Sequence, residues 1–388
     1  MRHCAILDIG SSKVVCMIVS SEPDGAIIVH GTGIREYSGY RLGELPNRRE
    51  LAQSVSGAIH AAERAAKVTV KELTVGVPSP FMLVQKSEGA VEITSRGGRV
   101  TQADVDRLIA DSLGAVPDGY SLIHSTPVSY IADKTPIKGS PLGLPCGVLS
   151  AAVSHCFADD RYKDMVSLML ERMNITVDSF VSTALAAACF TVPEELRAKN
   201  VLLVDCGGSY TEATLIEGNA IIGSGAVPIG GRHFTSDLCY GLRLPEGVAE
   251  DIKRRYVFSL DYGESCERVK IPGEGVFDIE HSFIQLIIES RAEELCELLA
   301  EKLDSMAGRE TPVWLVGSGF GLMRGAKEFL ETRVKRNVAV SMPTVSRNSS
   351  VSFAAAFGLA DFALFRMGRT SALRRTERYL RRTFDWRS

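Results

Sequence analysis

Two stretches of the sequence, about half a chain apart, share one layout, and this repeat constrains the fold more than any other feature. "AILDIGSSKVVCMIV" (5–19) is an apolar run broken by Asp8 and a small polar turn, and "VLLVDCGGSYTEATLI" (201–216) is broken by Asp205 and a glycine turn. An ordinary two-residue hairpin explains either copy taken alone. Unpaired charges in a buried sheet, however, cost on the order of several kcal/mol. The repeat therefore indicates two related halves whose turns face one charged ligand.

The rest of the chain favours an α/β protein that carries an insertion. Strand–turn–strand units are followed by helical patterns, in which apolar residues recur on one face. Residues 84 to about 156 differ, because short strands alternate with a helix that Thr101 and Asp104 begin in capping-box spacing. We expect a small α+β subdomain there. The other expected elements are strands at 3–9, 13–20, 27–33 and 72–77, and helices at about 51–66, 160–173, 183–190, 245–256 and 279–304.

The composition is that of an ordinary soluble protein with two or more domains. The chain has 388 residues, of which 45% are hydrophobic and 23% charged. Its longest apolar runs fall short of the roughly 20 residues that span a membrane, and Met1-Arg2-His3 leads into a strand and not into a signal peptide. The nine cysteines form no Cys-x-x-Cys pair. We therefore expect reduced thiols in the cytoplasm, without a zinc site or a disulfide framework.

Positive charge is concentrated at the C-terminus. From Arg366 to Ser388 there are eight arginines and two acidic residues, a net charge of +6. Since the whole chain carries −3, the first 365 residues carry −9. An acidic body with a basic tail indicates that the tail meets an anionic partner that the body does not.

The first turn has the groups that a phosphate needs. Backbone N–H groups of residues 10–12 would point inward, and Lys13 adds a positive charge. Asp8 and Asp205 end their strands just before the two turns, although either one alone is also a common turn or cap residue. Two carboxylates that face a polyphosphate are tolerable when a divalent cation lies between them, usually Mg²⁺ held through waters. The pairing predicts such a metal site.

A third glycine segment, "VWLVGSGFGLMRG" (313–325), matches a dinucleotide-binding fingerprint only in part. Gly317 and Gly319 are present, but Leu322 stands where the third glycine is required. No acidic residue closes a following strand about twenty residues further on. A loop that lets an adenine and a ribose lie against its backbone fits this segment better.

In this order, the three motifs resemble the phosphate-1, phosphate-2 and adenosine motifs of the actin/Hsp70/sugar-kinase superfamily. Within it, the chain resembles the FtsA family of bacterial cell-division proteins over nearly its whole length. "DIGSSKV" is close to that family's opening, and "GAVPIGGRHFTSDL", "AEDIKRRY" and "IESRAEEL" are similar to later family segments. "SEGAVEI", "VTQADVDRLI" and "HSTPVSYIADK" resemble its SHS2-type subdomain, which stands where actin has a different one.

The resemblance implies an actin-like two-domain ATPase fold that binds ATP and Mg²⁺. The implied parts are domain 1 at 1–83 and 157–195, an inserted SHS2-type subdomain at 84–156, the phosphate-2 region of domain 2 at 196–240, its small subdomain at 241–305, the adenosine region and return helix at 306–365, and a tail at 366–388. The implied nucleotide-binding residues are Gly10, Ser11, Ser12, Lys13, Gly207, Gly208, Ser209, Glu250, Lys253, Gly317, Ser318, Gly319 and Phe320, with Asp8 and Asp205 holding Mg²⁺ through water.

The chain departs from the family pattern around the second turn. Where the family has Asp-Ile-Gly-Gly-Gly-Thr-Thr-Asp, residues 205–212 read Asp-Cys-Gly-Gly-Ser-Tyr-Thr-Glu, and Tyr210 is bulky beside a phosphate. Position 318 is Ser where Gly is usual. The segment "STALAAACF" (182–190), which is expected to line the site, has no Gln, Glu or Asp to orient a water. We therefore expect nucleotide binding with at most weak ATPase activity.

The C-terminal stretch "SALRRTERYLRRTFDWRS" is amphipathic when it is placed on a helix. Arginine flanks with an aromatic end suit a helix that lies in an anionic leaflet, and proteins of the FtsA family end in such a membrane-targeting helix. The alternatives are a helix docked on the body or a nucleic-acid arm, and the acidic body argues against nucleic acid. The apolar stripe is Leu373, Thr376, Tyr379, Leu380, Phe384 and Trp386, flanked by Arg374, Arg375, Arg378, Arg381 and Arg382.

The resemblance implies an adaptor of the division septum. Such a protein polymerises on the cytoplasmic face of the inner membrane and tethers the tubulin-like protein FtsZ, alongside other division proteins. The FtsZ tail-binding subdomain would be 241–305, where Arg291 either contacts the acidic peptide or is simply paired among Glu289, Glu293 and Glu294. The alternatives are a pilus-assembly protein and a soluble Hsp70-like or sugar-kinase-like ATPase of the same superfamily.

Overall fold

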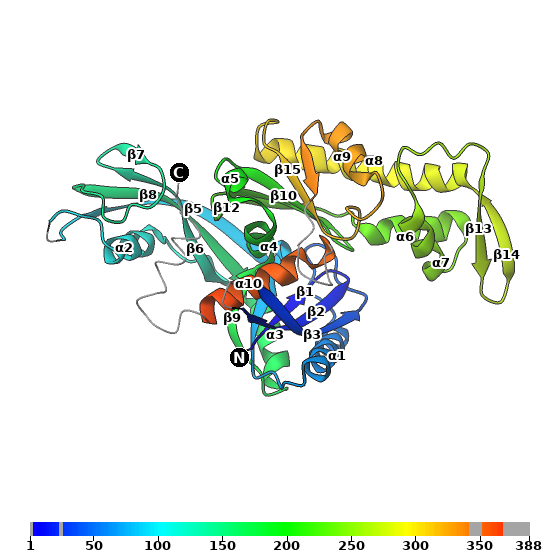
Figure 1. The fold of residues 1–388 in the computed structure, drawn as a ribbon, viewed down its shortest axis with the longest axis horizontal. Helices are drawn as coiled ribbons and strands as arrows, with labels where there is room; N and C mark the ends of the chain where they lie inside the picture. Colours follow the sequence, from blue (N-terminus) through cyan, green and yellow to red (C-terminus); the bar gives the residue numbers. More distant parts are fainter. Residues whose placement is uncertain (1–2, 23–25, 96, 341–350, 368–388) are drawn as a thin grey trace.

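Two five-stranded sheets with the same strand order form the centre of the molecule (Figure 1). The computed structural model describes residues 3–22, 26–95, 97–340 and 351–367. The first sheet, in the order β3-β2-β1-β4-β9, consists of β1 (Cys4–Ile9), β2 (Lys13–Ser21), β3 (Ile27–Glu36), β4 (Glu72–Val77) and β9 (Thr176–Ser182). The second, in the order β12-β11-β10-β15-β16, consists of β10 (Val201–Cys206), β11 (Thr211–Glu217), β12 (Ala220–Val227), β15 (Val313–Val316) and β16 (Val338–Val340).

The two sheets also pair their strands in the same way. β1 is antiparallel to β2 and parallel to β4, and β10 is antiparallel to β11 and parallel to β15. The turn that follows each central strand therefore lies at the carboxyl edge of its sheet, where α/β proteins bind ligands. The internal repeat that the sequence predicts is present in the structure.

Two helices, α4 (Thr183–Thr191) and α10 (Ala354–Met367), pack against each other between the sheets. α10 contributes to a core with β1 and β2, and α4 contributes to a core with β10 and β11. The other face of the first sheet packs on α1 (Arg48–Ala66) and α3 (Asp160–Glu171). The core of the second sheet includes α6 (Gly231–Leu242), α7 (Glu246–Arg255), α8 (His281–Met306) and α9 (Ala326–Val334). The short segments are α5 (Glu194–Arg197), η1 (Ser79–Phe81) and η2 (Val351–Phe353).

The elongated molecule ends in two small substructures (Figure 1). At one end lies the predicted α+β insertion, which has its own core and a sheet of order β5-β8-β6-β7. Its helix begins at the predicted capping box, since the Thr101 and Asp104 side chains each bond the other's backbone N–H. The insertion comprises β5 (Met82–Glu92), α2 (Gln102–Ser112), β6 (Tyr120–Ala132), β7 (Thr135–Ile137) and β8 (Val148–Asp159); the hairpin of β13 (Cys266–Ile271) and β14 (Gly275–Glu280) lies at the opposite end.

The nine cysteines, all within the described residues, are free thiols. None of the helices in the described ranges combines the length and the hydropathy that crossing a bilayer requires.

Candidate functional site

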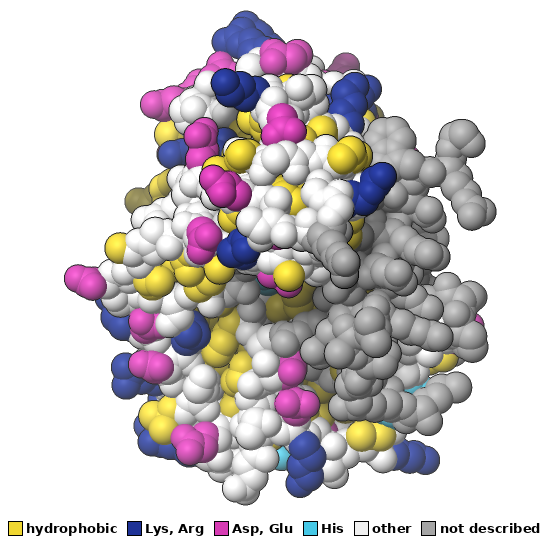
Figure 2. Space-filling model, turned by 90° about the vertical axis from the view of Figure 1, so that its left-hand side faces the viewer, with side chains coloured by type: hydrophobic (Ala, Val, Ile, Leu, Met, Phe, Trp, Pro, Cys, Tyr) yellow, Lys and Arg dark blue, Asp and Glu magenta, His cyan; other side chains and the backbone are white. Residues whose placement is uncertain are grey.

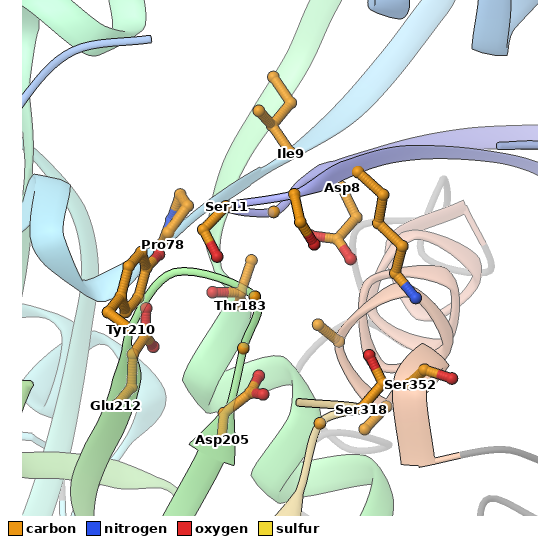
Figure 3. Close-up of a pocket in the computed structure, with 18 residues that line it drawn as sticks. Asp8, Ile9, Ser11, Pro78, Thr183, Asp205, Tyr210, Glu212, Ser318 and Ser352 are labelled. Atoms are coloured by element: carbon orange, nitrogen blue, oxygen red, sulfur yellow. The ribbon is translucent and has the colours of Figure 1, made fainter. Parts of the chain in front are cut away.

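The turns after β1 and β10 face one cavity (Figure 3). Each turn is closed in the same way. The Gly10 N–H donates to the Lys13 carbonyl over 2.9 Å, and the Gly207 N–H donates to the Tyr210 carbonyl over 3.0 Å. The structure therefore brings the two predicted turns together as equivalent parts of one site.

The two turns also touch directly. The Ser209 N–H donates to Ser11 Oγ, and the Ser209 hydroxyl donates to the Ser11 carbonyl, each over 3.1 Å. A Cβ added at Gly208 would lie 2.5 Å from the Cβ of Ser12. Glycine is therefore required at this position for the two backbones to approach so closely.

The glycine segment after β15 packs against the second turn. The Gly319 N–H donates to the Cys206 carbonyl over 2.7 Å. Gly317 has a φ of +87°, and a Cβ there would lie 2.2 Å from Asp205 Oδ1. Gly317 and Ser318 line the cavity, so the segment predicted to contact an adenosine borders the same space as the two turns.

Three carboxylates and one lysine line this cavity: Asp8, Asp205, Glu212 and Lys13. Burial raises the pKa of Asp8 to about 6; Lys13 opposes this rise and Asp205 adds to it. Burial also raises the pKa of Asp205 to about 6, again opposed by Lys13. Burial lowers the pKa of Lys13, and the two aspartates counteract that effect. This excess of negative charge in a partly dry site favours a bound cation.

The arrangement fits a hydrated cation better than a metal held by protein side chains alone. Within the described ranges, no group of three or more His, Cys, Asp or Glu side chains is placed to hold a metal ion. Asp8 and Asp205 come from equivalent strand ends and both line the cavity. Oxygen ligands shared between two carboxylates, waters and a phosphate are what Mg²⁺ prefers, so these residues fit the predicted ion.

Glu212 lines the cavity from β11, although the sequence predicted no role for it. Its side chain is buried, and Ser79 Oγ from the other half of the molecule donates to its Oε2 over 2.8 Å. Burial and the charge of Asp205 raise the pKa of Glu212 to about 7, against the hydrogen bond from Ser79. An acidic residue within the buried strand "TEATLI" was the available signal. Other lining residues that the sequence did not place at the site are Ile9, Pro78, Ser352, Ala354 and Ala355, whereas Thr183 and Tyr210 line it as expected.

The bulk of Tyr210 is accommodated in the core of the opposite half. The side chain is 4% exposed and packs with residues of the first sheet. Its hydroxyl lies 2.8 Å from the hydroxyl of Tyr40. Tyr210 thus forms a wall of the cavity (Figure 3), and its hydroxyl pairs with that of Tyr40 in the first half.

Several predicted nucleotide-binding residues do not line this cavity. Lys253 is buried, and its Nζ donates to Glu250 Oε2 over 2.6 Å and to the Gly231 carbonyl over 3.1 Å. The Phe320 side chain is buried in the core of the second half. Their contact with a nucleotide stays a prediction. The predicted nucleotide-binding residues that do not line the cavity are Ser209, Glu250, Lys253, Gly319 and Phe320.

Arg291 lies in a separate cavity of about 340 Å³ between α6 and α8. Its Nε donates to Asp237 Oδ2 over 2.6 Å, and its Nη1 donates to Glu294. Of the three glutamates expected around it, Glu294 is thus a partner. Asp237 of α6, which the sequence did not predict as a partner, accepts two hydrogen bonds from the same guanidinium. Tyr240 and Leu286, which are 91% and 65% exposed, also line this cavity.

The predicted membrane residues lie outside the described part of the chain. They are Leu373, Leu380, Phe384, Trp386, Arg378, Arg381 and Arg382.

On the described face of the molecule toward the inserted subdomain, acidic and basic side chains are interspersed (Figure 2). This part of the surface therefore lacks the uniformly basic character that nucleic-acid binding requires.

Comparison with known families gives two matches. The model for "Cell division protein FtsA" matches residues 202–358, and the model for "SHS2 domain inserted in FTSA" matches residues 82–155. The chain is 28% identical over 344 residues to the cell division protein FtsA of Pseudomonas aeruginosa, covering 87% of this chain and 82% of that one. It is 28% identical over 339 residues to FtsA of Neisseria meningitidis, covering 85% and 81%.

Solved structures with the same fold are actin-like. A chain of the PilM–PilN type IV pilus biogenesis complex aligns with a TM-score of 0.62 at 17% identity, covering 93% of this chain and 98% of that one. MreB5 of Spiroplasma citri bound to AMPPNP gives 0.54 at 12% identity, covering 98% and 99%. The MamK double helical filament gives 0.51 at 10% identity, covering 96% and 100%. At these identities the likeness establishes the fold alone.

Proposed function

Because the chain belongs to the FtsA family of cell division proteins, we propose that it is an actin-like adaptor that binds Mg-ATP and tethers FtsZ to the membrane. It acts at the division site, on the cytoplasmic face of the inner membrane, where it polymerises. The observation that carries the nucleotide part is the meeting of two equivalent glycine turns, two half-buried aspartates and one lysine at one cavity.

The parts of this site have distinct roles in the proposal. Backbone N–H groups of the two turns bind phosphate oxygens, Lys13 adds positive charge, and the segment at Gly317 lies against the adenosine. Asp8 and Asp205 hold the ion through waters. When bound, Mg²⁺ neutralises the phosphate charge that the two carboxylates would otherwise repel.

The membrane and partner functions rest on other parts of the chain. The basic, amphipathic sequence of 366–388 supports membrane attachment, and the exposed Tyr240 and Leu286 beside Arg291 support peptide binding between α6 and α8. MreB5 was solved with a nucleotide analogue and MamK as a filament. We propose nucleotide binding and filament formation for this chain as well.

Calorimetry with Mg-ATP tests the nucleotide site. Asp8→Ala or Gly208→Val should weaken binding at least tenfold, about 1.4 kcal/mol, because the first removes an ion-holding group and the second pushes the turns apart. Gly247→Val is the matched control, since a Cβ at Gly247 meets nothing within 4 Å. Unchanged affinity in both site variants would overturn the site.

Flotation with anionic liposomes tests the membrane function. The double variant Phe384→Glu/Trp386→Glu should detach from the liposomes and keep its nucleotide affinity, since burial of each apolar side chain contributes roughly 1.5–3 kcal/mol. Raised salt should weaken attachment without abolishing it. Phe277→Glu, at an exposed position on β14, is the control. Flotation of the double variant at the wild-type level would exclude the tail as the anchor.

Binding of the FtsZ C-terminal peptide tests the partner site. Arg291→Glu should abolish binding, because it places a third acidic side chain beside Asp237 and Glu294. Arg333→Glu on α9 is the control, since Arg333 is also ion-paired but does not line this cavity. If the Arg291 variant bound as well as wild type, Arg291 would be withdrawn as a contact.

A further inference from the structure

A third cavity, of about 370 Å³, lies between α4 and α10 and shares no lining residue with the nucleotide cavity. Its walls are mostly apolar. The two helices are in close contact beside it, because a Cβ at Gly358 would lie 2.2 Å from the Ala186 carbonyl oxygen. Six of the lining residues are Leu185, Ala186 and Cys189 of α4 and Gly358, Phe362 and Phe365 of α10.

We propose that this cavity docks the chain's own C-terminal segment, residues 368–388, and so keeps the segment's apolar face covered when the protein is off the membrane. The inference concerns regulation of the tail and rests on the proposed membrane function for its biological meaning.

Continuity and length favour this segment as the occupant. α10 ends at Met367, two residues after Phe365, which lines the cavity, and the sequence continues from 368 to 388. Helices joined antiparallel need a connection of about 2–5 residues, which 368–372 (Gly-Arg-Thr-Ser-Ala) supply. Residues 373–386 would then equal α10 in length, at about 1.5 Å per residue, and run back along it.

Charge also favours this segment. Glu194, Asp361 and Arg197 line the cavity, so these three side chains give it a formal net charge of −1, whereas the tail has a stripe of arginines beside its apolar residues. Arg197 is the cation among the described lining residues, and its guanidinium already donates to the Val192 and Cys189 carbonyls and to Asn219. The cavity therefore matches a basic amphipathic helix better than an acidic one.

Docking and membrane insertion would use the same face of the tail. Phe362 and Phe365 are partly exposed beside the cavity, so covering them removes apolar surface from water. An apolar stripe that covers these residues cannot lie in a bilayer at the same time. Docking therefore lowers the membrane affinity of the free protein, and a membrane surface competes with the cavity for the tail.

Alkylation of Cys189 in the full chain tests the docking. Cys189 lines the cavity and is exposed, and Cys266 on β13 is an exposed internal control far from it. Iodoacetamide labelling, mapped by mass spectrometry, should modify Cys189 at least threefold faster in Phe384→Glu/Trp386→Glu than in wild type, with Cys266 unchanged. Phosphatidylglycerol vesicles should accelerate Cys189 labelling in wild type. Equal Cys189 rates in both proteins, with or without vesicles, overturn the proposal.

A variant of the cavity gives an independent readout. Cys189→Trp fills the space, so the full chain should bind phosphatidylglycerol vesicles at least threefold more tightly than wild type. If the tail variant loses vesicle binding, so that the tail is the anchor, unchanged or weaker binding of Cys189→Trp overturns the docking. Protection of Cys189 that rises with protein concentration also overturns it, since that assigns the cavity to a second copy. If the tail variant exposes Cys189 yet still binds vesicles like wild type, the docking stands and the proposed membrane anchor fails.

Discussion

The two glycine turns are closed by the same backbone hydrogen bond, but they differ in the side chain of their last residue, which is Lys13 in the first turn and Tyr210 in the second. Lys13 and Tyr210 both accept the closing hydrogen bond of their turn. The Lys13 side chain lies at the cavity, with its Nζ 4.8 Å from the centre of the Phe353 ring. The Tyr210 side chain instead enters the core of the opposite half and meets Tyr40. The first turn thus contributes charge, and the second contributes closure between the halves.

This difference explains how a symmetric scaffold can bind an asymmetric ligand. Asp8 and Asp205 occupy equivalent positions, so each half places one aspartate at the cavity, and the second half adds Glu212. A second lysine at position 210 would balance the two aspartates within the protein. Tyrosine leaves the excess of negative charge that favours an added cation, and it ties the second turn to the first half.

The largest expected effect is the loss of the single lysine at the cavity. Lys13→Met keeps most of the side-chain length but removes the charge, so Mg-ATP affinity measured by calorimetry should fall at least tenfold, about 1.4 kcal/mol. Tyr210→Phe, at the equivalent position of the other turn, should leave affinity within twofold. Equal losses in the two variants would show that the turns do not divide their roles in this way.

Glu212 is expected to have the next largest effect, on turnover. ATP hydrolysis should be slow, below the ordinary enzyme range of ~1–10³ per second, because α4 has no acidic residue at the cavity. What hydrolysis there is should increase as pH rises through about 7, since Glu212 can accept a proton only once it has lost its own. Glu212→Gln should lower the rate about tenfold and remove this pH dependence. A phosphate-release assay that finds the same profile in both proteins excludes Glu212 as the base.

Asp205→Asn should stabilise the unliganded protein. The pKa of Asp205 is about 6 in the folded protein, against 3.8 for an unperturbed aspartate, so its charged form opposes folding, and this destabilisation develops as pH rises from about 4 to 6. The pKa difference sets an upper limit of about 3 kcal/mol, and the partial exposure of Asp205 reduces it. At pH 7.5 in EDTA, the free energy of unfolding of the variant should therefore exceed that of wild type by about 1 kcal/mol. The difference should vanish below pH 4.

The control for this effect is Asp278, an aspartate whose pKa is shifted in the opposite direction. The hydrogen bond and charge of Arg268 lower the pKa of Asp278, so Asp278→Asn should bring no gain in stability at pH 7.5. Urea denaturation of the two variants checks the comparison. A gain of the same size in both would trace the effect to net charge and not to the cavity.

Local patterns were enough to predict the elements that frame the site. Glycine turns and apolar runs predicted strands at 72–77 and 13–20, and the structure has β4 at Glu72–Val77 and β2 at Lys13–Ser21. The capping box at Thr101 was also correct. These features depend on residues close in sequence, so the chain itself contains the information.

Contacts between distant segments could not be predicted in the same way. Glu212 faces the cavity and bonds Ser79, 133 residues away, so its role depends on how the halves meet. Arg291 was expected either to contact an acidic peptide or to pair with glutamates on its own helix. It does pair with Glu294, but it also donates two hydrogen bonds to Asp237 of α6, 54 residues away. Spacing along one helix indicates neighbours at three and four residues and contains nothing about a second helix.

The smallest expected effect is that of the hydrogen bond between the Tyr210 and Tyr40 hydroxyls, which ties the second turn to the first half. Tyr210→Phe removes one hydroxyl and leaves the buried Tyr40 hydroxyl without its partner at 2.8 Å, so the free energy of unfolding should fall by about 1 kcal/mol. Tyr240→Phe, at a 91% exposed position, should change it by less than about 0.5 kcal/mol. The double variant Tyr40→Phe/Tyr210→Phe should be no less stable than Tyr210→Phe alone, because two apolar rings leave no unsatisfied hydroxyl. Additive losses in urea denaturation would mean that the two hydroxyls act independently, and the contrast between a charged first turn and a closing second turn would then lose its structural basis.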